Sequence, residues 1–557
     1  MRIDAFVYVV VIFLLLSSPV FAQAVPEGRG ANGGSVDYEI PDSYVDSARQ
    51  SGPYSELSLQ EAVRMALENN LQIEIEGYTQ ELNKELMYGT EGFYDPLFNF
   101  AIGWNSSERP TTSVLEAGQS VRTTISKRWN YNSSLSQNVR GGGNVALQFN
   151  TNSASTNSFF SYINPSYNSN LNLSFTQPLW RGFRNTTYGR QMKLYNLDAK
   201  INESQFKLTV AGIINQVQSQ YWELAYAIEN HETRRQSLKL ALIQLADNRK
   251  RVEIGVLAPI EITSSRAEAA SRSQEMIASE VSITNAQNSL KGFLSPDTKD
   301  PLWGRIIIPT EKPLLREVNM TLDEAVETAL KKRPELEQLT YQVTQNEVDR
   351  SYYINQGKPD ISFTAGLISQ GTSGIVYDTS GGSSGGLPGV GPIPALDHPF
   401  YGKYGTAWSQ VYGFDYLTYN FGINVEIPIR NRSNKAQLAQ LAINDRRYQT
   451  QVRSVQQSVM VEVRNAFQNI ITQQESMDAA RVARELSEEQ LDGVTKRFAA
   501  GLSTNFEILQ YQRDLVNAQV NELRAMIDYQ LALAALQAAT FTIVDDNDVL
   551  IAERAVN

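Results

Sequence analysis

Few side chains in this 557-residue chain have the type and spacing that chemistry requires. The chain has two histidines, His231 and His398, and no cysteine. His231 lies in a long helical pattern and His398 in a loop, and neither has a second ligand at metal-binding spacing. We therefore expect two solvent-exposed histidines and no metal site. Glu261 and Glu507 could act as a general acid or base, but each follows a helical turn, where a carboxylate stabilises the start of the next helix.

Sequence motifs for catalysis or cofactor binding are also missing. No GxSxG, Walker loop or dinucleotide fingerprint occurs in a suitable context. The segment GGSSGG at 381–386 has the composition of a loop. These observations predict that the protein is not an enzyme and binds no cofactor. A net charge of −11 argues against nucleic acid as a partner.

The N-terminus has the features of an exported protein. Residues 1–22 combine Arg2, an apolar run and a small-residue cleavage site, which is typical of a secretory signal. Residues 23–56 are rich in Gly, Ser and Asp and predict a flexible leader. No apolar run of membrane-helix length follows, and the absence of cysteine excludes a lipid-modified N-terminal cysteine. Attachment to a membrane would have to come from the fold.

The elements that would position functional residues occur twice. The stretch from Arg251 to Ser273 returns from Arg497 to Gln519, at an offset of 246 residues. Near the start of each copy, LSLQEAVRMAL and MTLDEAVETAL align at an offset of 263. The chain is thus divided into a first repeat at 57–292, a linker at 293–320, a second repeat at 321–541 and a C-terminal tail at 542–557.

Each repeated stretch reads as a tight turn between two long helices. Gly255 and Gly501 stand where a backbone with positive φ would end the first helix. Ser503 and its two successors are suited to capping the next helix. The helical patterns are long: residues 434–492 contain neither Pro nor Gly, which corresponds to roughly 90 Å of helix. The segment 190–254 matches it, with a coiled-coil-like apolar seam that packs against other long helices.

Four segments alternate apolar with small or polar residues: 98–104, 171–175, 361–367 and 417–427. Alternating segments of roughly 9–11 residues are what a transmembrane β-barrel strand requires. A water-facing antiparallel sheet has the same pattern, but the export signal and the long flanking helices favour the membrane. The loop at 370–400 predicts an exposed connection. An extra hairpin at 131–150 gives no indication of whether it joins a barrel.

With these features the chain resembles the outer membrane efflux protein (TolC) family. The resemblance covers about 57–541 and rests on LSLQEAVRMALENN, LDEAVETALKKRPEL, TQPLWRGF and RFAAGLSTNFEILQYQRDLVNAQ. It implies a mainly α protein with membrane β structure: a homotrimer with four strands per protomer forms a 12-stranded outer-membrane barrel, continued by a periplasmic α-helical barrel. The linker and the C-terminal tail would form a girdle around the helices.

The resemblance also implies the function and its residues. The protein would be the passive exit duct of a tripartite efflux or type I secretion system in a Gram-negative outer membrane. Its partners would be a periplasmic adaptor, an inner-membrane transporter and outer-membrane lipid. The adaptor-contacting tip residues would be Arg251, Gly255, Val256, Leu257, Arg497, Gly501, Leu502 and Ser503.

Residues of the periplasmic constriction can be placed by aligning the second tip on Gly501. They are Phe498, Ser503, Glu507 and Gln510, where well-studied members have a tyrosine, an arginine and two aspartates. Glu507 alone keeps a carboxylate. We therefore expect a closed state that rests more on helix packing, with Glu507 as a cation-selective ring. An adhesin or structural outer-membrane protein with a helical stalk is the alternative, although a stalk has no use for two equivalent tips. The cargo and the pump class stay open.

Overall fold

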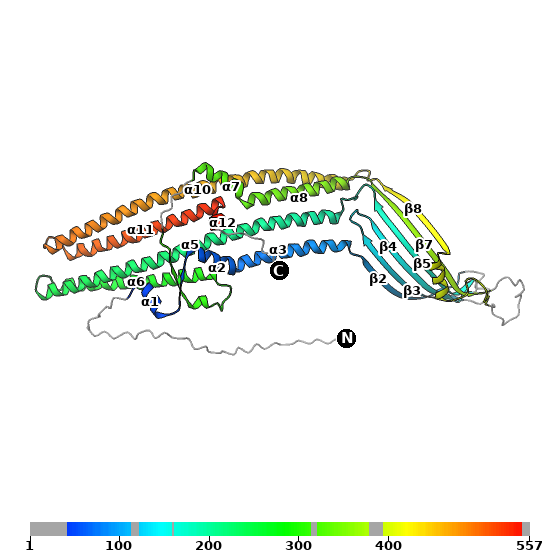
Figure 1. Cartoon of the computed structure of the whole chain (residues 1–557), viewed down its shortest axis with the longest axis horizontal. Helices are drawn as coiled ribbons and strands as arrows, with labels where there is room; N and C mark the ends of the chain where they lie inside the picture. The colour runs from blue at the N-terminus through cyan, green and yellow to red at the C-terminus, as the bar shows by residue number, and fades with distance from the viewer. Residues whose placement is uncertain (1–41, 113–121, 159–160, 314–319, 378–393, 548–557) are drawn as a thin grey trace, which may run out of the picture.

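The computed structural model describes residues 42–112, 122–158, 161–313, 320–377 and 394–547. The predicted signal at 1–22, the start of the leader and the end of the C-terminal tail lie outside these ranges. The described chain is elongated, with a bundle of long helices leading into one β-sheet (Figure 1). Among the described residues, no helix is both long enough and apolar enough to cross a membrane.

Four helical columns run toward the sheet. They are α3 (Leu71–Glu91), α5 (Thr187–Glu253), α8 (Pro334–Gln356) and α10 (Arg432–Ala499). At the opposite end, α6 (Ile260–Leu294) returns alongside α5, and α11 (Asn505–Thr540) returns alongside α10 (Figure 1). With 67 and 68 residues, α5 and α10 each extend roughly 100 Å. The two long helices expected from the sequence are confirmed.

The apolar seam of α5 forms the centre of the largest core cluster. Val217, Tyr221 and Leu224 have no solvent exposure and pack with Ile283 and Leu290 of α6. Because the polar faces of these helices stay exposed, burial of this stripe is what holds the columns together laterally. A smaller cluster links Val459 and Val463 of α10 to α7 and α11.

The first helix of each repeat is broken at the same repeat position. The sequence predicts one helix at about 58–92, but α2 (Leu59–Asn69) ends at Asn70, whose side chain caps α3. In the second repeat, α7 (Leu322–Lys332) ends at Arg333, and Pro334 opens α8. Both break residues leave the helical backbone conformation, and a side-chain cap or a proline at N1 starts the next helix. The Ser58 side chain caps α2, and Thr321 caps α7 with a full capping box.

The sheet has six antiparallel strands in the order β2-β3-β4-β5-β7-β8. The strands are β2 (Leu97–Pro110), β3 (Thr123–Asn138), β4 (Asn144–Thr156), β5 (Ile163–Pro178), β7 (Asp360–Val376) and β8 (Tyr416–Glu426). The four strands implied by the family resemblance are therefore wrong for this chain. The extra hairpin forms β3 and β4 and pairs fully between β2 and β5, with Gly142 at positive φ in its turn.

The two faces of the sheet differ in chemistry, as the alternation predicts. One face carries Phe98, Phe100, Ile102 and Trp104 of β2 and Tyr419, Phe421, Ile423 and Val425 of β8, all of them exposed in the single chain. The other face carries rows of amides, such as Asn132, Asn150 and Asn170, which pair across β3, β4 and β5. The Asn150 side-chain amide donates to Asn170 at 3.1 Å. Such a sheet separates an apolar from an aqueous environment.

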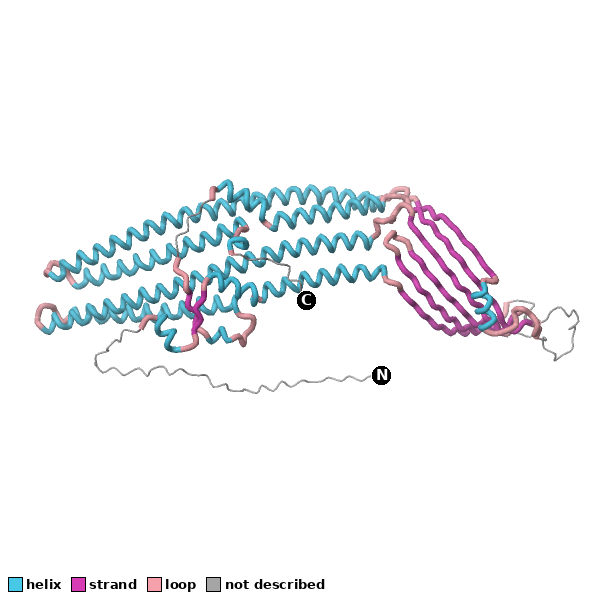
Figure 2. The backbone as a smooth tube through the Cα atoms, in the orientation of Figure 1, coloured by secondary structure: helices cyan, strands magenta, loops and turns pink. Residues whose placement is uncertain are grey.

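Two segments differ from the sequence expectations, and a further short helix was not predicted. Residues 23–56 were expected to be a flexible leader, but they contain α1 (Tyr44–Ser51) and the start of β1 (Tyr54–Leu57). Strand β1 pairs in parallel with β6 (Ile306–Pro309), and Tyr221 of α5 donates to Leu57 at 3.1 Å. In the expected loop at 370–400, residues 370–376 complete β7, and 378–393 lie outside the described ranges. Helix α9 (Tyr404–Gly413) then covers the sheet at its end far from the long helices (Figure 2).

Candidate functional site at the helical tips

The first tip joins α5 to α6 through residues 254–259. Gly255 has φ +78°, and the Val256 backbone N–H donates to the Arg251 carbonyl at 2.8 Å. This is the closing bond of a glycine-terminated helix, which satisfies carbonyls that have no partner within the helix. Helix α6 starts after Pro259, with Glu261 in its first turn.

The second tip repeats this geometry. Gly501 has φ +77°, and the Leu502 N–H donates to the Arg497 carbonyl at 2.8 Å. The Thr504 hydroxyl then caps α11 by accepting from the Glu507 N–H. The predicted positive-φ glycines, the cap and the carboxylates in the first turns are confirmed.

Apolar side chains project from both tips. Ile254, Val256 and Ile260 at the first tip and Leu502 and Phe506 at the second are 64–74% exposed. Clusters of this kind on a soluble surface indicate a protein-binding site. Of the predicted adaptor contacts, Gly255, Val256, Arg497, Gly501 and Leu502 are exposed, whereas Arg251, Leu257 and Ser503 are partly buried.

Leu257 and Arg251 are partly buried because they contact the other tip. Leu257 packs on a cluster formed by Val494, Phe498 and Ile508. The Arg251 guanidinium lies 4.7 Å from the centre of the Phe498 ring, a cation–π distance. Phe498, expected at the constriction, is 8% exposed in the single chain. It joins the two hairpins of one protomer.

The other three expected constriction residues lie on the first two turns of α11 or just before it. Ser503 donates a hydrogen bond to the Glu507 carboxylate, which is partly buried. Gln510, one turn further along α11, is exposed. A carboxylate and an amide on one helix, one turn apart, can form stacked polar rings when several copies of the helix surround an axis.

Sequence reasoning missed a buried polar network between the two tips. Asn505 is 2% exposed, Asn248 of α5 is fully buried and Ser265 of α6 is 1% exposed. The Asn248 amide donates to Asn505 and to Ser265, both at 2.8 Å, and the Asn505 amide donates to Glu261 at 2.9 Å. Gln244 also donates to Asn505, at 3.2 Å.

A departure from the repeat would have indicated this network. At the 246-residue offset, Asn248 corresponds to Val494, Ser265 to Tyr511 and Asn505 to Pro259. At two of these positions the second copy has an apolar or aromatic residue where the first has a polar one, and at the third the first copy has proline where the second has Asn505. Buried polar side chains need hydrogen-bond partners. Asn248 and Ser265, which are polar only in the first repeat, would therefore be expected to find a partner in the second repeat, and that partner is Asn505.

A charged cluster reinforces the contact further from the tips. Arg513 of α11 pairs with Glu268 of α6 at 3.2 Å, and Glu268 also pairs with Arg272 at 2.8 Å. Arg524 of α11 pairs with Glu223 of α5 at 2.9 Å. The contacts between the hairpins therefore change from apolar packing and side-chain hydrogen bonds near the turns to ion pairs further along the helices.

The histidines offer no metal site in the described part of the chain. His231 was expected to be exposed, but it is 4% exposed, and its Nδ1 lies 2.8 Å from the Ser279 hydroxyl of α6. Burial lowers its pKa below the ordinary value. His398 lies in a loop, where its Nε2 is 3.2 Å from the Tyr162 hydroxyl. No cluster of three metal-ligating side chains occurs among the described residues.

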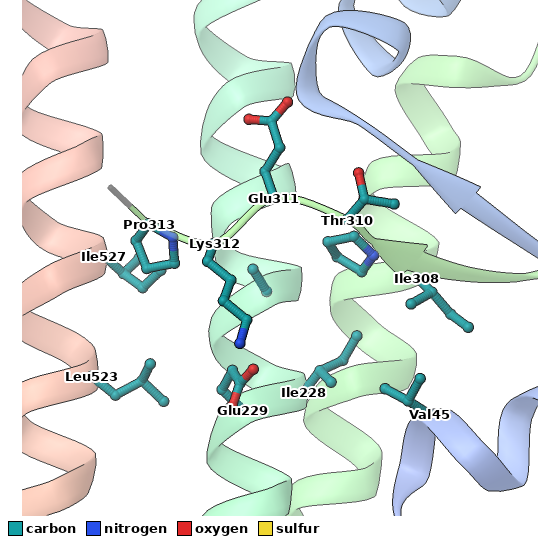
Figure 3. Close-up of a pocket in the computed structure, with 12 residues that line it drawn as sticks. Val45, Ile228, Glu229, Ile308, Thr310, Glu311, Lys312, Pro313, Leu523 and Ile527 are labelled. Carbon is teal, nitrogen blue, oxygen red and sulfur yellow. The ribbon is translucent and has the colours of Figure 1, made fainter. Parts of the chain in front are cut away.

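A small hollow lies away from the tips, on the side of the helices. It lies where residues 308–313 cross α5 near α11, lined by Val45, Ile228 and Ile527 among others (Figure 3). Its volume is about 100 Å³, below the roughly 300 Å³ at which small-molecule sites begin. The tips are therefore the candidate site.

Comparison with known proteins agrees with this architecture. Residues 389–540, which include the second tip, match the family model described as outer membrane efflux protein, so the resemblance seen in the sequence is confirmed. Comparison with curated protein sequences gives no match.

Similar solved structures extend the likeness to most of the chain. A membrane protein from Pseudomonas aeruginosa superimposes with a TM-score of 0.60 at 16% identity, covering 90% of this chain and 98% of that one. The CmeC outer membrane channel of Campylobacter jejuni gives a TM-score of 0.60 at 14% identity, covering 88% and 89%. The open MtrE outer membrane channel of Neisseria gonorrhoeae gives 0.54 at 17%, covering 86% and 88%. At these identities the likeness establishes the fold.

Proposed function

We propose that this chain, which carries an outer membrane efflux protein segment at residues 389–540 and the fold of outer-membrane channels, is the exit duct of a tripartite efflux or type I secretion system. It is an outer-membrane protein with a long periplasmic extension. It conducts substrates passively, and the energy for transport comes from an inner-membrane pump. A duct needs a continuous passage and a closable end, so the lack of catalytic groups in the described chain is consistent with this role.

The observation that carries the proposal is the sheet with two open edges. Strands β2 and β8 are its outermost strands, and each would leave a row of backbone N–H and C=O groups without partners. Such edges are not tolerated in lipid. Pairing β2 of one copy with β8 of the next removes them, places the apolar face toward lipid and encloses the amide-lined face.

Closure by a homotrimer gives a barrel of eighteen strands, because each protomer supplies six. The expectation of twelve strands is replaced accordingly. Barrel diameter grows with strand number, and barrels of about 16–18 strands leave an aqueous channel. The asparagine ladders would line this channel with neutral hydrogen-bonding groups, which suits passage of chemically varied polar solutes.

At the other end of the molecule, the exposed apolar side chains of the two tips would bind the periplasmic adaptor. Val256 and Leu502 occupy equivalent places in the two repeats, so one protomer offers two similar sites. Three protomers would offer six, matching an adaptor that surrounds the duct. The remaining tip contacts proposed from the sequence are Arg251, Gly255, Leu257, Arg497, Gly501 and Ser503.

The periplasmic end would also be the gate. Glu507 and Gln510 would face the axis, with Glu507 as a cation-selective ring. Closure would rest on the packing of Phe498 and Leu257 and on the Asn505 network, since both join the hairpins within a protomer. Opening would then separate α10 and α11 from α5 and α6.

The alternative function, an adhesin or structural protein with a helical stalk, accounts for the helices alone. It gives no role to two equivalent apolar tips or to a polar inner face of the sheet.

Cross-linking in cells would test the proposal. A photo-reactive amino acid at Leu502 is expected to capture a periplasmic adaptor. The same group at Leu486 of α10, which is exposed and away from the turn, serves as the control. The purified protein is expected to have the mass of a trimer by light scattering in detergent. A monodisperse monomer, or equal capture from both positions, would contradict the proposal.

A further inference from the structure

Helix α9 creates a hollow on the apolar face of the sheet. It packs over β5 and β7, where small residues let it approach: a Cβ on Gly371 would lie 2.1 Å from the Ala407 carbonyl oxygen. The Ser369 hydroxyl donates to the Val411 carbonyl at 2.7 Å, and Ser373 donates to the Lys403 carbonyl at 2.7 Å. The helix therefore lies fixed on this face and stands above the neighbouring strands β2, β3 and β4.

The hollow between α9 and those strands is almost entirely apolar. Its volume is about 360 Å³, within the roughly 300–1,000 Å³ of small-molecule sites. It is lined by Phe100, Tyr131, Ser133, Phe149, Thr151, Tyr404 and Trp408. The aromatic rings come from three strands and from the helix, so they surround the space on several sides.

The two aliphatic hydroxyl groups of the lining, those of Ser133 and Thr151, are already engaged with the protein. Ser133 donates to the Phe149 carbonyl at 3.3 Å. The Thr151 hydroxyl lies 2.6 Å from the Ser169 hydroxyl and accepts from the Trp408 indole N–H at 3.4 Å. Because these bonds engage the hydroxyls of Ser133 and Thr151 and aromatic rings form most of the remaining lining, the hollow favours a hydrocarbon ligand over one with several donors or acceptors of its own.

Cationic groups stand toward the end of the sheet far from the helices. Lys127 is on the same face of β3 as Tyr131, four residues or about 13 Å further from the helices. Lys403 is the residue at the start of α9. Both side chains are exposed. Aromatic side chains with lysines on the side away from the helices are arranged as at a membrane–water interface.

We propose that this hollow binds one acyl chain of an anionic membrane lipid, with Lys127 and Lys403 next to its phosphate. The inference rests on the proposed function in one respect: the apolar face of the sheet must be the face turned to lipid. The site would anchor α9 and fix the depth at which the barrel sits in the membrane. It differs from ordinary lipid contact because the chain would enter between α9 and the strands.

Tryptophan quenching by lipids with brominated chains tests this site, because bromine quenches indole on contact. The full-length protein is reconstituted in phosphatidylcholine vesicles with increasing fractions of brominated phosphatidylglycerol. The signal of Trp408 is obtained by subtracting the signal of Trp408→Phe. Trp104 and Trp129, on the same face but outside the lining, report general lipid contact. Trp408 is expected to reach half-maximal quenching at about a tenth of the lipid fraction that they require.

Three variants test the hollow and the charged group beside it. Ser133→Met fills it and is expected to abolish the early quenching of Trp408, whereas Ser134→Met, on the opposite face of β3, leaves it unchanged. In wild type, brominated phosphatidylglycerol is expected to quench Trp408 more strongly than brominated phosphatidylcholine does. Lys127→Gln is expected to reduce this difference. The proposal would be overturned if Trp408, Trp104 and Trp129 reached half-maximal quenching at the same lipid fraction. Equal quenching of wild type by the two brominated lipids, or no effect of Ser133→Met, would also overturn it.

Channel conductance measured on the same preparations separates this inference from the proposed function. A preparation that conducts but shows uniform quenching overturns the lipid site alone. A preparation that neither inserts nor conducts overturns the proposed function, and the lipid site with it.

Discussion

Replacing Asn505 with alanine should loosen the contact between the two tips of one protomer. Asn505 accepts from Gln244 and Asn248 and donates to Glu261, and its side chain is 2% exposed. Alanine leaves the fully buried Asn248 amide without one of its acceptors. A buried polar group left unsatisfied costs about 1–3 kcal/mol. At about 2 kcal/mol, the ratio of separated to joined tips rises roughly 30-fold per protomer.

The distance between the tips can be measured directly because the chain has no cysteine. Cysteines introduced for Val256 and Leu502, both exposed, are spin-labelled, and the distance is measured by double electron–electron resonance with labelled chains diluted in unlabelled ones. Wild type is expected to give one narrow distribution. Asn505→Ala should add a population at longer distance.

A matched control and a compensating variant sharpen the result. Asn517→Ala removes an exposed asparagine from the same helix and should leave the distribution narrow. Asn248→Val combined with Asn505→Leu replaces both partners with apolar groups and should disturb the tips less than the two single changes added together. Identical distributions for Asn505→Ala and Asn517→Ala would refute the reasoning that the network holds the tips.

Three further predictions concern the tip backbone, the buried histidine and the constriction. Gly501→Ala should destabilise the tip by about 1–2 kcal/mol because Gly501 has positive φ. Gly493→Ala, inside α10, should instead stabilise the helix by about 1 kcal/mol. Melting temperatures that change in the same direction for both variants would contradict this. Burial lowers the pKa of His231 below its ordinary value of 6.5, so the histidine takes up a proton at higher pH in the unfolded chain than in the folded one, and stability is lost as pH falls from about 6.5 through the lowered pKa. Between pH 7.5 and 5, the melting temperature of His231→Gln should therefore fall less than that of wild type. An equal fall in the two proteins would exclude His231 as the cause. Glu507→Gln should reduce cation preference in reversal-potential measurements across planar bilayers, and an unchanged preference would remove Glu507 from the constriction.

The repeat made much of the helical part predictable from sequence. Local rules suffice there: a glycine at positive φ after α5 and α10, a threonine cap before α11, and an apolar seam along α5. The break between α2 and α3 was missed because Asn70 caps the following helix through its own side chain, which a hydrophobic period does not reveal.

The sheet was harder to predict because pairing is a non-local property. The alternation in β3 and β4 indicates strands, but it does not say whether a hairpin adds to an existing sheet or stands apart from it. The register between β4 and β5 settles the question in the structure. The family resemblance suggested four strands, and this chain departs from it by one inserted hairpin.

The tip network was missed for a related reason. Asn505 reads locally as part of a helix cap, and its burial comes from contacts with Asn248 and Ser265, more than 200 residues away in sequence. His231 was likewise taken as exposed because the partner helix α6 that covers it could not be placed from the sequence. In both cases the missing information was which helices lie side by side.

Single-channel conductance tests the central claim most directly. The purified protein and a variant lacking residues 123–156, which form β3 and β4, are compared in planar bilayers. In the variant β2 and β5 remain antiparallel and can pair, which restores four strands per protomer. The account predicts discrete channels for both proteins, with a clearly larger conductance for wild type when the helical end is opened by Asn505→Ala in each. Absence of channels in wild type would contradict the exit-duct function, and equal conductance would contradict a barrel widened by the hairpin.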